Sequence, residues 1–177
     1  MNYRLNKFQP LFSNKIVLNE IKGIKIPNFR EKHDVIRRWI INKDILQKSN
    51  EEEIKPDYFI DFFKTILGYT GITTQEDKFT LRIEKKTETD RTKPDGILGF
   101  YDKKGKTETT QAVIEVKGWK IDLDAKQKDR TPVEQAFRYL HKYDKCRWVI
   151  VTNFYELRLY KNGRSQNYCE RFFLEDL

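Results

Sequence analysis

The sequence contains few of the residues that build disulfide scaffolds, zinc sites or membrane spans. Of 177 residues, two are cysteine and two are histidine. Cys146 and Cys169 lack the paired spacing of a zinc site, and so few thiols are typical of a reducing compartment. No segment approaches the roughly 20 apolar residues that span a bilayer, and the N-terminus lacks the apolar core of a secretion signal. We therefore expect a soluble cytoplasmic protein that does not enter membranes.

Charge and aromatic content are the strongest features of the composition. Lysine and arginine total 35 against 27 acidic residues, a net charge of +8 that is spread along the chain. This excess favours a polyanionic partner such as nucleic acid. Twelve Phe, nine Tyr and three Trp argue against disorder. The length fits one domain with a substantial core, or one domain with a helical appendage.

The order of hydrophobic patterns predicts an α/β protein, in which helices flank a mixed central β-sheet. Helical periodicity covers residues 28–48, 50–67 and 131–143. Extended patterns cover residues 79–83, 96–101, 110–118, 147–152, 155–160 and 166–174, and residues 85–93 form a polar connection. We expect a meander of three strands, a crossover helix, and two or three further strands.

Two parts of unequal size are expected along the chain. Residues 1–48 form an accessory N-terminal segment that is partly helical, and residues 49–177 form the main domain. The piece before residue 28 is punctuated by Pro10, Gly23 and Pro27 and has no clear period. We expect this piece to pack on the domain.

The strand expected at 110–118 breaks the pattern of a buried strand. Its apolar residues suit a central position, yet it carries Glu115 and Lys117. Side chains alternate across a strand, so Val113, Glu115 and Lys117 share one face. Such violations of the polar pattern tend to mark function. A structural ion pair on a half-exposed strand is the alternative, and both interpretations remain open at this point.

A second carboxylate lies on the neighbouring strand of the expected hairpin. Asp95 precedes the strand at 96–101, and the turn at 102–106 brings this strand beside Glu115. Two carboxylates at one point suit a hard cation, above all Mg²⁺. Such a cation lowers the pKa of bound water, and Lys117 would orient that water and stabilise developing charge.

Three consecutive glutamates open the helix at 50–67. Glu51, Glu52 and Glu53 follow a capping residue, Ser49 or Asn50, and complement the helix dipole. One of them alternatively points into a site at the helix N-terminus. Three acidic residues in a row give no register argument to choose between them.

Together these residues resemble the PD-(D/E)XK nuclease superfamily. Pro94-Asp95, nineteen further residues and then Glu115-Val116-Lys117 match its core motif. Gln135-Ala-Phe-Arg-Tyr139 is similar to the QxxxY element of the RecB-like branch. The strand pair at 147–160 and the helix at 51–69 also resemble parts of restriction nuclease domains. The resemblance covers roughly residues 50–162 and is greatest to the N-terminal nuclease domain of type IIG restriction-modification enzymes. The nuclease domain of type I restriction subunits is nearly as similar.

The resemblance implies a restriction-endonuclease-like fold and a role for each motif residue. Asp95, Glu115 and the Val116 carbonyl would bind Mg²⁺, for which Mn²⁺ would substitute. Lys117 would serve the attacking water, and Gln135 would steady Lys117 or a metal-bound water. The remaining implied roles are site support or a DNA phosphate contact for Tyr139, and a further acidic ligand from Glu51, Glu52 or Glu53.

The implied activity is a restriction-type, Mg²⁺-dependent endodeoxyribonuclease that hydrolyses double-stranded DNA. Its sequence specificity would lie elsewhere, in methyltransferase and target-recognition domains of the same polypeptide or complex. The rival hypothesis is a DNA-binding module that keeps the nuclease fold without cutting. Charge alone does not distinguish DNA from RNA as the substrate.

Overall fold

The computed structural model describes residues 8–83 and 93–177. The expected connection at 85–93 lies, except for Lys93, outside the described residues. The helices are α1 (Asn14–Ile21), α2 (Phe29–Ile41), α3 (Lys43–Leu46), α4 (Glu51–Tyr58), the π-helix η1 (Phe59–Ile66), α5 (Pro132–Arg138) and the 3₁₀ helices η2 (Tyr139–Lys142) and η3 (Leu174–Asp176). The strands are β1 (Lys78–Ile83), β2 (Gly96–Asp102), β3 (Glu108–Val116), β4 (Trp148–Thr152), β5 (Glu156–Lys161) and β6 (Cys169–Phe173).

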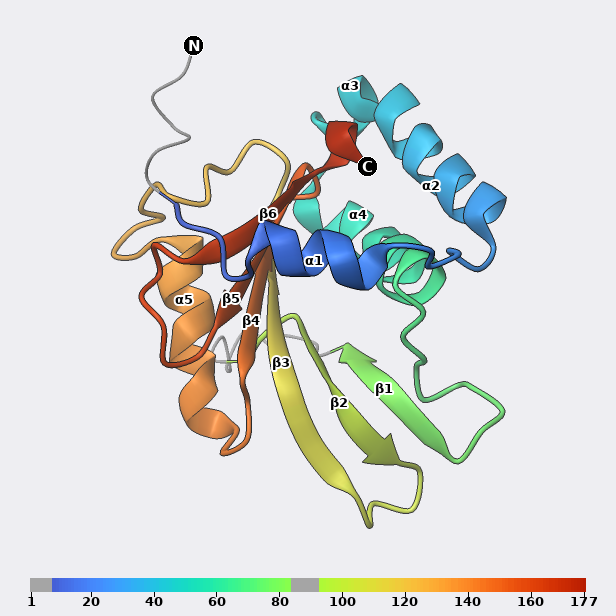
Figure 1. Cartoon of the computed structure of the whole chain (residues 1–177). Helices are drawn as coiled ribbons and strands as arrows, with labels where there is room; N and C mark the ends of the chain where they lie inside the picture. The colour runs from blue at the N-terminus through green and yellow to red at the C-terminus, as the bar shows by residue number, and fades with distance from the viewer. Residues whose placement is uncertain (1–7, 84–92) are drawn as a thin grey trace.

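The six strands form one sheet in which sequence order is also spatial order (Figure 1). Neighbouring strands are antiparallel, except that β3 and β4 are parallel. A parallel pair needs a crossover connection, which is supplied by the segment that contains α5. The expected meander, crossover helix and final strands are confirmed, and with them the mixed sheet flanked by helices.

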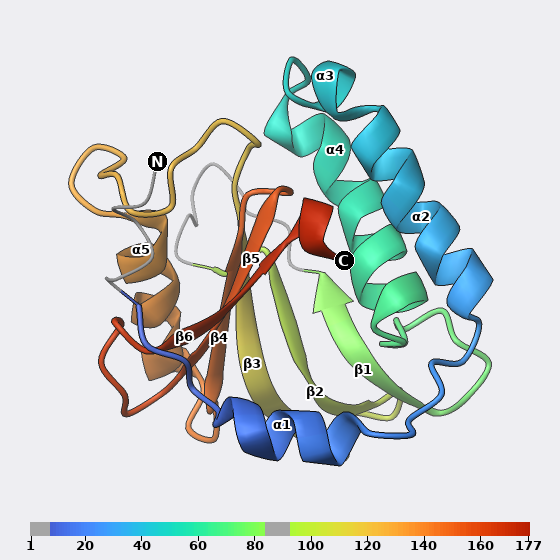
Figure 2. The ribbon, with the colours of Figure 1, turned by 45° about the horizontal axis from the view of Figure 1, so that its top comes forward.

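Helices cover both faces of the sheet (Figure 2). On one face, α2, α4 and η1 pack on the sheet through a cluster that includes Trp39, Tyr58 and Phe59. On the other face, α5 contributes Val133 and Ala136 to a second cluster. Because successive side chains of a strand point to opposite faces, β3 supplies both clusters. The C-terminal residues of β3, next to the candidate site, are therefore packed on both faces of the sheet.

The helix expected at 50–67 changes its winding midway. It is an α-helix to Tyr58 and a π-helix from Phe59 to Ile66. The wider winding is visible in the hydrogen bond from the Leu67 N–H to the Phe62 carbonyl, five residues earlier. The π-helix ends at Ile66, and Gly68, two residues later, has a φ of +80° that favours glycine.

The N-terminal segment packs on the domain only in part. Gln9 forms a parallel bridge with Tyr168, and the Phe12 N–H donates to the Glu170 side chain. By contrast, every residue of α1 is exposed, including Ile16 and Leu18. The expectation that the whole segment packs on the domain is therefore wrong for α1. Its eight residues follow Ser13 as a helix, but none is buried.

Two general expectations about the chain can be compared with the fold. Cys146 and Cys169 are buried free thiols, in agreement with the absence of a thiol motif. In the described part of the chain, no helix has both the length and the apolar character needed to cross a bilayer.

Replacing Gly99 by Ala is expected to destabilise the fold by about 3 kcal/mol or more. A Cβ at this position would lie 2.1 Å from the backbone oxygen of Thr109, at the bulge between β2 and β3. Backbone atoms of a paired strand cannot move away cheaply, so the hairpin would have to distort. Denaturant unfolding monitored by circular dichroism measures the loss.

Gly105→Ala is the control for this prediction. Gly105 has φ +71° and no atom within 4 Å of a Cβ, so its replacement tests left-handed backbone strain alone. That strain costs roughly 1–2 kcal/mol. If Gly99→Ala proved no more costly than the control, the steric argument would be wrong.

Candidate active site

Asp95 is fixed at the start of β2 by the end of β3. Its backbone N–H donates to the Ile114 carbonyl at 2.9 Å, and its Oδ2 accepts a hydrogen bond from the Val116 N–H at 2.8 Å. The side chain is buried, with 2% exposure. A buried carboxylate needs such partners, because removing it from water without them is costly. The hairpin thus brings Asp95 beside the motif on β3, as the sequence predicted.

Glu115 is completely buried and receives two side-chain hydrogen bonds on the same oxygen. Lys117 Nζ lies 2.5 Å from Glu115 Oε1, and Gln135 Nε2 donates to Oε1 at 2.7 Å. Gln135 also contacts the Tyr139 hydroxyl at 2.8 Å. The QxxxY residues therefore meet the strand motif directly, and Glu115 and Lys117 do form an ion pair.

Helix α5 brings Gln135 and Tyr139 to the sheet because its start is well defined. The Thr131 hydroxyl accepts from the Glu134 N–H, and the Glu134 carboxylate accepts from the Thr131 N–H. This is a capping box, with Pro132 in the first turn. A helix whose first turn is fixed in this way presents Gln135 in a defined direction.

The backbone at Lys117 continues the pairing of β3 beyond the strand. Its N–H donates to the Thr152 carbonyl at 2.8 Å. The Thr152 hydroxyl is hydrogen-bonded to the Tyr58 hydroxyl at 2.8 Å, and burial raises the pKa of Tyr58 well above its ordinary value. Helix α4, β4 and Lys117 are thus tied together at one point.

The three glutamates of α4 point in different directions. Glu51 Oε2 accepts from the Gly118 N–H at 2.7 Å, directly after the strand motif. Glu52 is exposed, and its ion pair is with Lys55 of its own helix, at 2.7 Å. Glu53 lines a separate cavity of about 290 Å³ between α2 and α4. Glu51 is therefore the glutamate that the structure places against the strand motif.

Lys55 is a member of the site that the sequence analysis did not identify. Its Nζ lies 3.1 Å from Asp95 Oδ1, 3.2 Å from Glu51 Oε1 and 2.7 Å from Glu52 Oε1. Burial by itself lowers the pKa of this ammonium, but Asp95, Glu52 and Glu51 outweigh burial and raise the pKa. The only sequence signal was its spacing of four residues from Glu51, which usually indicates a surface ion pair.

Four carboxylates and two ammonium groups lie around the strand motif. Within residues 8–83 and 93–177, no three His, Cys, Asp or Glu side chains form a metal-binding group by themselves. Mg²⁺ is commonly held by only one or two carboxylates, with water and phosphate as the other ligands. When all are ionised, the carboxylates exceed the ammonium groups by two charges. The six groups are Glu51, Glu52, Asp95, Glu115, Lys55 and Lys117.

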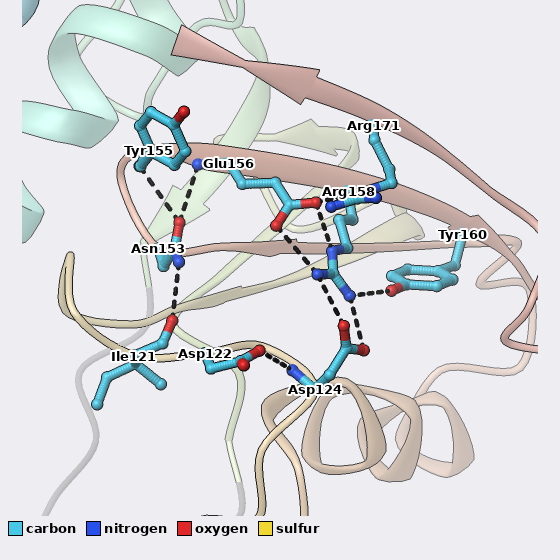
Figure 3. A network of polar contacts seen from close by, with 9 residues as sticks. All are labelled: Ile121, Asp122, Asp124, Asn153, Tyr155, Glu156, Arg158, Tyr160 and Arg171. Carbon is cyan, nitrogen blue, oxygen red and sulfur yellow. Dashed lines mark hydrogen bonds and ion pairs between the residues drawn. The ribbon is translucent and has the colours of Figure 1, made fainter. Parts of the chain in front are cut away.

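A second polar network lies beside the site and centres on Arg158 (Figure 3). Arg158 is 2% exposed, and its five N–H groups point to Glu156, Asp124 and Tyr160. Arg171 also donates to Glu156, at 2.5 Å. Burial alone lowers the pKa of Arg158, but its bonds to Glu156 and Asp124 reverse this effect and raise the pKa.

This network holds the loop that follows Lys117. Asp124 belongs to the polar segment between β3 and α5, whereas Glu156 and Arg158 lie on β5. Glu115 pairs with Val151 across β3 and β4, and Val151 pairs with Arg158 across β4 and β5. Arg158 is therefore two strands from Glu115 in the same row of the sheet. We infer that it anchors the loop leaving the candidate site.

Comparison with known proteins gives one family. The model of the MmeI N-terminal domain matches residues 30–177, which include every candidate site residue. Neither the curated proteins nor the solved structures provide a match. MmeI is a type IIG restriction enzyme, the class to which the sequence motifs are similar. The family model covers most of the chain, which therefore belongs to the MmeI N-terminal domain family of restriction enzymes.

Proposed function

We propose that this chain is the DNA-cleavage domain of a restriction-modification enzyme and hydrolyses phosphodiester bonds with Mg²⁺. The observation that carries the proposal is the meeting of four motif residues, three at the ends of neighbouring strands and the fourth, Gln135, on α5. Lys117 and Gln135 both bind Glu115, and Asp95 is held by the N–H of Val116. This arrangement supports a PD-(D/E)XK nuclease site of the QxxxY type.

Asp95, Glu115 and the Val116 carbonyl are the groups that would hold the metal, with Glu51 at the edge of the site. When bound, Mg²⁺ would supply a Lewis acid and lower the pKa of a bound water. Mn²⁺ has similar ligand preferences and is expected to substitute.

Lys117 is the residue we assign to the attacking water and the phosphate. Its ammonium is held against Glu115, yet its side chain keeps 15% exposure and so stays partly accessible from solvent. A fixed donor of this kind stabilises negative charge that develops on phosphate. Gln135 positions Lys117 indirectly, because both side chains share one oxygen of Glu115. Tyr139 in turn orients the Gln135 amide.

The proposal also implies partners. The net charge of +8 is suited to double-stranded DNA. In type IIG enzymes, methylation and target recognition belong to other regions of the polypeptide. We propose that such methyltransferase and target-recognition domains provide the sequence specificity that this domain lacks.

Plasmid nicking tests the function directly. We expect supercoiled plasmid to be nicked and linearised with Mg²⁺ or Mn²⁺, and to stay intact with EDTA. Binding should weaken steeply with salt, because each phosphate contact releases counterions. Fluorescence anisotropy with a labelled duplex at several salt concentrations measures this slope, and an RNA duplex as competitor tests the substrate class. Salt-dependent binding without cleavage at any protein concentration would instead support the non-cleaving module.

A further inference from the structure

We infer that Lys55 is the resident counter-ion of the acidic site and competes with the divalent cation for Asp95. This inference rests on the proposed function, because it concerns the metal site assigned there. It goes beyond that function by naming a residue that sets metal affinity. None of the motif matches includes Lys55.

The contacts of Lys55 identify Asp95 as the carboxylate for which Lys55 and the metal would compete. Its Nζ reaches Asp95 Oδ1 at 3.1 Å, while the other oxygen, Oδ2, accepts from the Val116 N–H. Both Asp95 oxygens therefore have a donor. A cation approaching Oδ1 meets an ammonium already in place. The Lys55 side chain is 11% exposed, so water screens this charge poorly.

Lys55 has alternative partners if it leaves Asp95. Glu51 and Glu52 lie four and three residues earlier on the same helix, and both already contact Nζ. Withdrawal from Asp95 therefore does not leave the ammonium without a carboxylate. In the absence of metal, Lys55 neutralises a carboxylate that is 2% exposed and would otherwise be costly to bury. Lys55 thus stabilises the metal-free fold and weakens metal binding.

Lys55→Met tests both consequences in the whole chain. Isothermal titration with Mn²⁺, and separately with Mg²⁺, is expected to show affinity about tenfold tighter than wild type, since a like charge beside Asp95 is removed. Without metal, the melting temperature should fall by roughly 5 °C or more. Lys48→Met is the matched control, because Lys48 is an exposed lysine that lies before the start of α4. It should alter neither quantity.

The Lys55→Met/Asp95→Asn double variant separates competition from general damage. If the cost of Lys55→Met comes from the loss of the ammonium beside the Asp95 carboxylate, the second change should restore metal-free stability while abolishing metal binding. The same comparison applies if Lys55→Met does not fold alone: recovery in the double variant supports the inference, and failure of both contradicts it.

The outcomes distinguish this inference from the function on which it rests. Metal binding by wild type that is unchanged or weaker in Lys55→Met contradicts the inference alone. No binding by either protein contradicts the metal site itself, and with it the inference. Tighter binding and lower metal-free stability in Lys55→Met, absent from the control, support both.

Discussion

Asp95→Asn is expected to reduce the rate of plasmid cleavage by at least about a hundredfold. The change keeps the shape of the side chain and an oxygen able to accept from the Val116 N–H, but it removes the negative charge that would hold the metal. Lys55 keeps Glu51 and Glu52 as partners, so the variant should fold. Nicking assays over a wide range of enzyme concentrations measure the rate, and circular dichroism confirms folding.

Asp57→Asn is the matched control for Asp95→Asn. Asp57 is an exposed aspartate on α4, so its replacement removes the same charge without touching the site. It should cleave at the wild-type rate. Lys117→Ala is the companion change directly after β3 and is expected to cause a loss of similar size, because it removes the donor assigned to the attacking water. Cleavage that survives either Asp95→Asn or Lys117→Ala would refute the site assignment.

Arg158→Met is expected to lower the free energy of unfolding by about 3–5 kcal/mol, the cost of breaking a buried ion pair by removing one partner. Glu156 is 6% exposed, and among residues 8–83 and 93–177 it would keep Arg171 as its one cationic partner. Asp124 would lose both hydrogen bonds that tie its loop to β5. Chemical denaturation measures the loss, and thermal unfolding should show a decrease of roughly 10 °C.

Arg164→Met removes the same charge from an exposed turn after β5 and is the control. Its effect should stay within about 0.5 kcal/mol, as is usual for surface substitutions. Asp124→Asn gives a finer test, because it weakens the anchor of the loop while leaving the pair between Arg158 and Glu156 in place. Its cost should lie between those of the other two variants. Equal stability of Arg158→Met and the control would mean that the network does not hold the fold.

The strands and their order could be predicted from the sequence alone. Alternating apolar residues set which face of each strand is buried, and the turn at 102–106 makes β2 and β3 neighbours. That arrangement brings Asp95 to Glu115 without knowledge of anything distant in the chain. The capping box at Thr131 likewise fixed the start of α5 through residues three apart. Local rules were sufficient wherever the relevant partners were close in sequence or paired in a hairpin.

The tertiary structure decided which side chains of a helix face the site, because this depends on how the helix is rotated against the sheet. Three consecutive glutamates satisfy the same local preference at a helix N-terminus, so only packing selects Glu51 to face Gly118. The same rotation buries Lys55 beside Asp95, forty residues away, where the local pattern indicated a surface pair. In the sequence, Arg158 is an ordinary residue of an alternating strand. Only the tertiary structure places Asp124, from the loop after β3, against it. Long-range contacts create these environments, because burial gives an ordinary charged residue a new partner and a new energetic role.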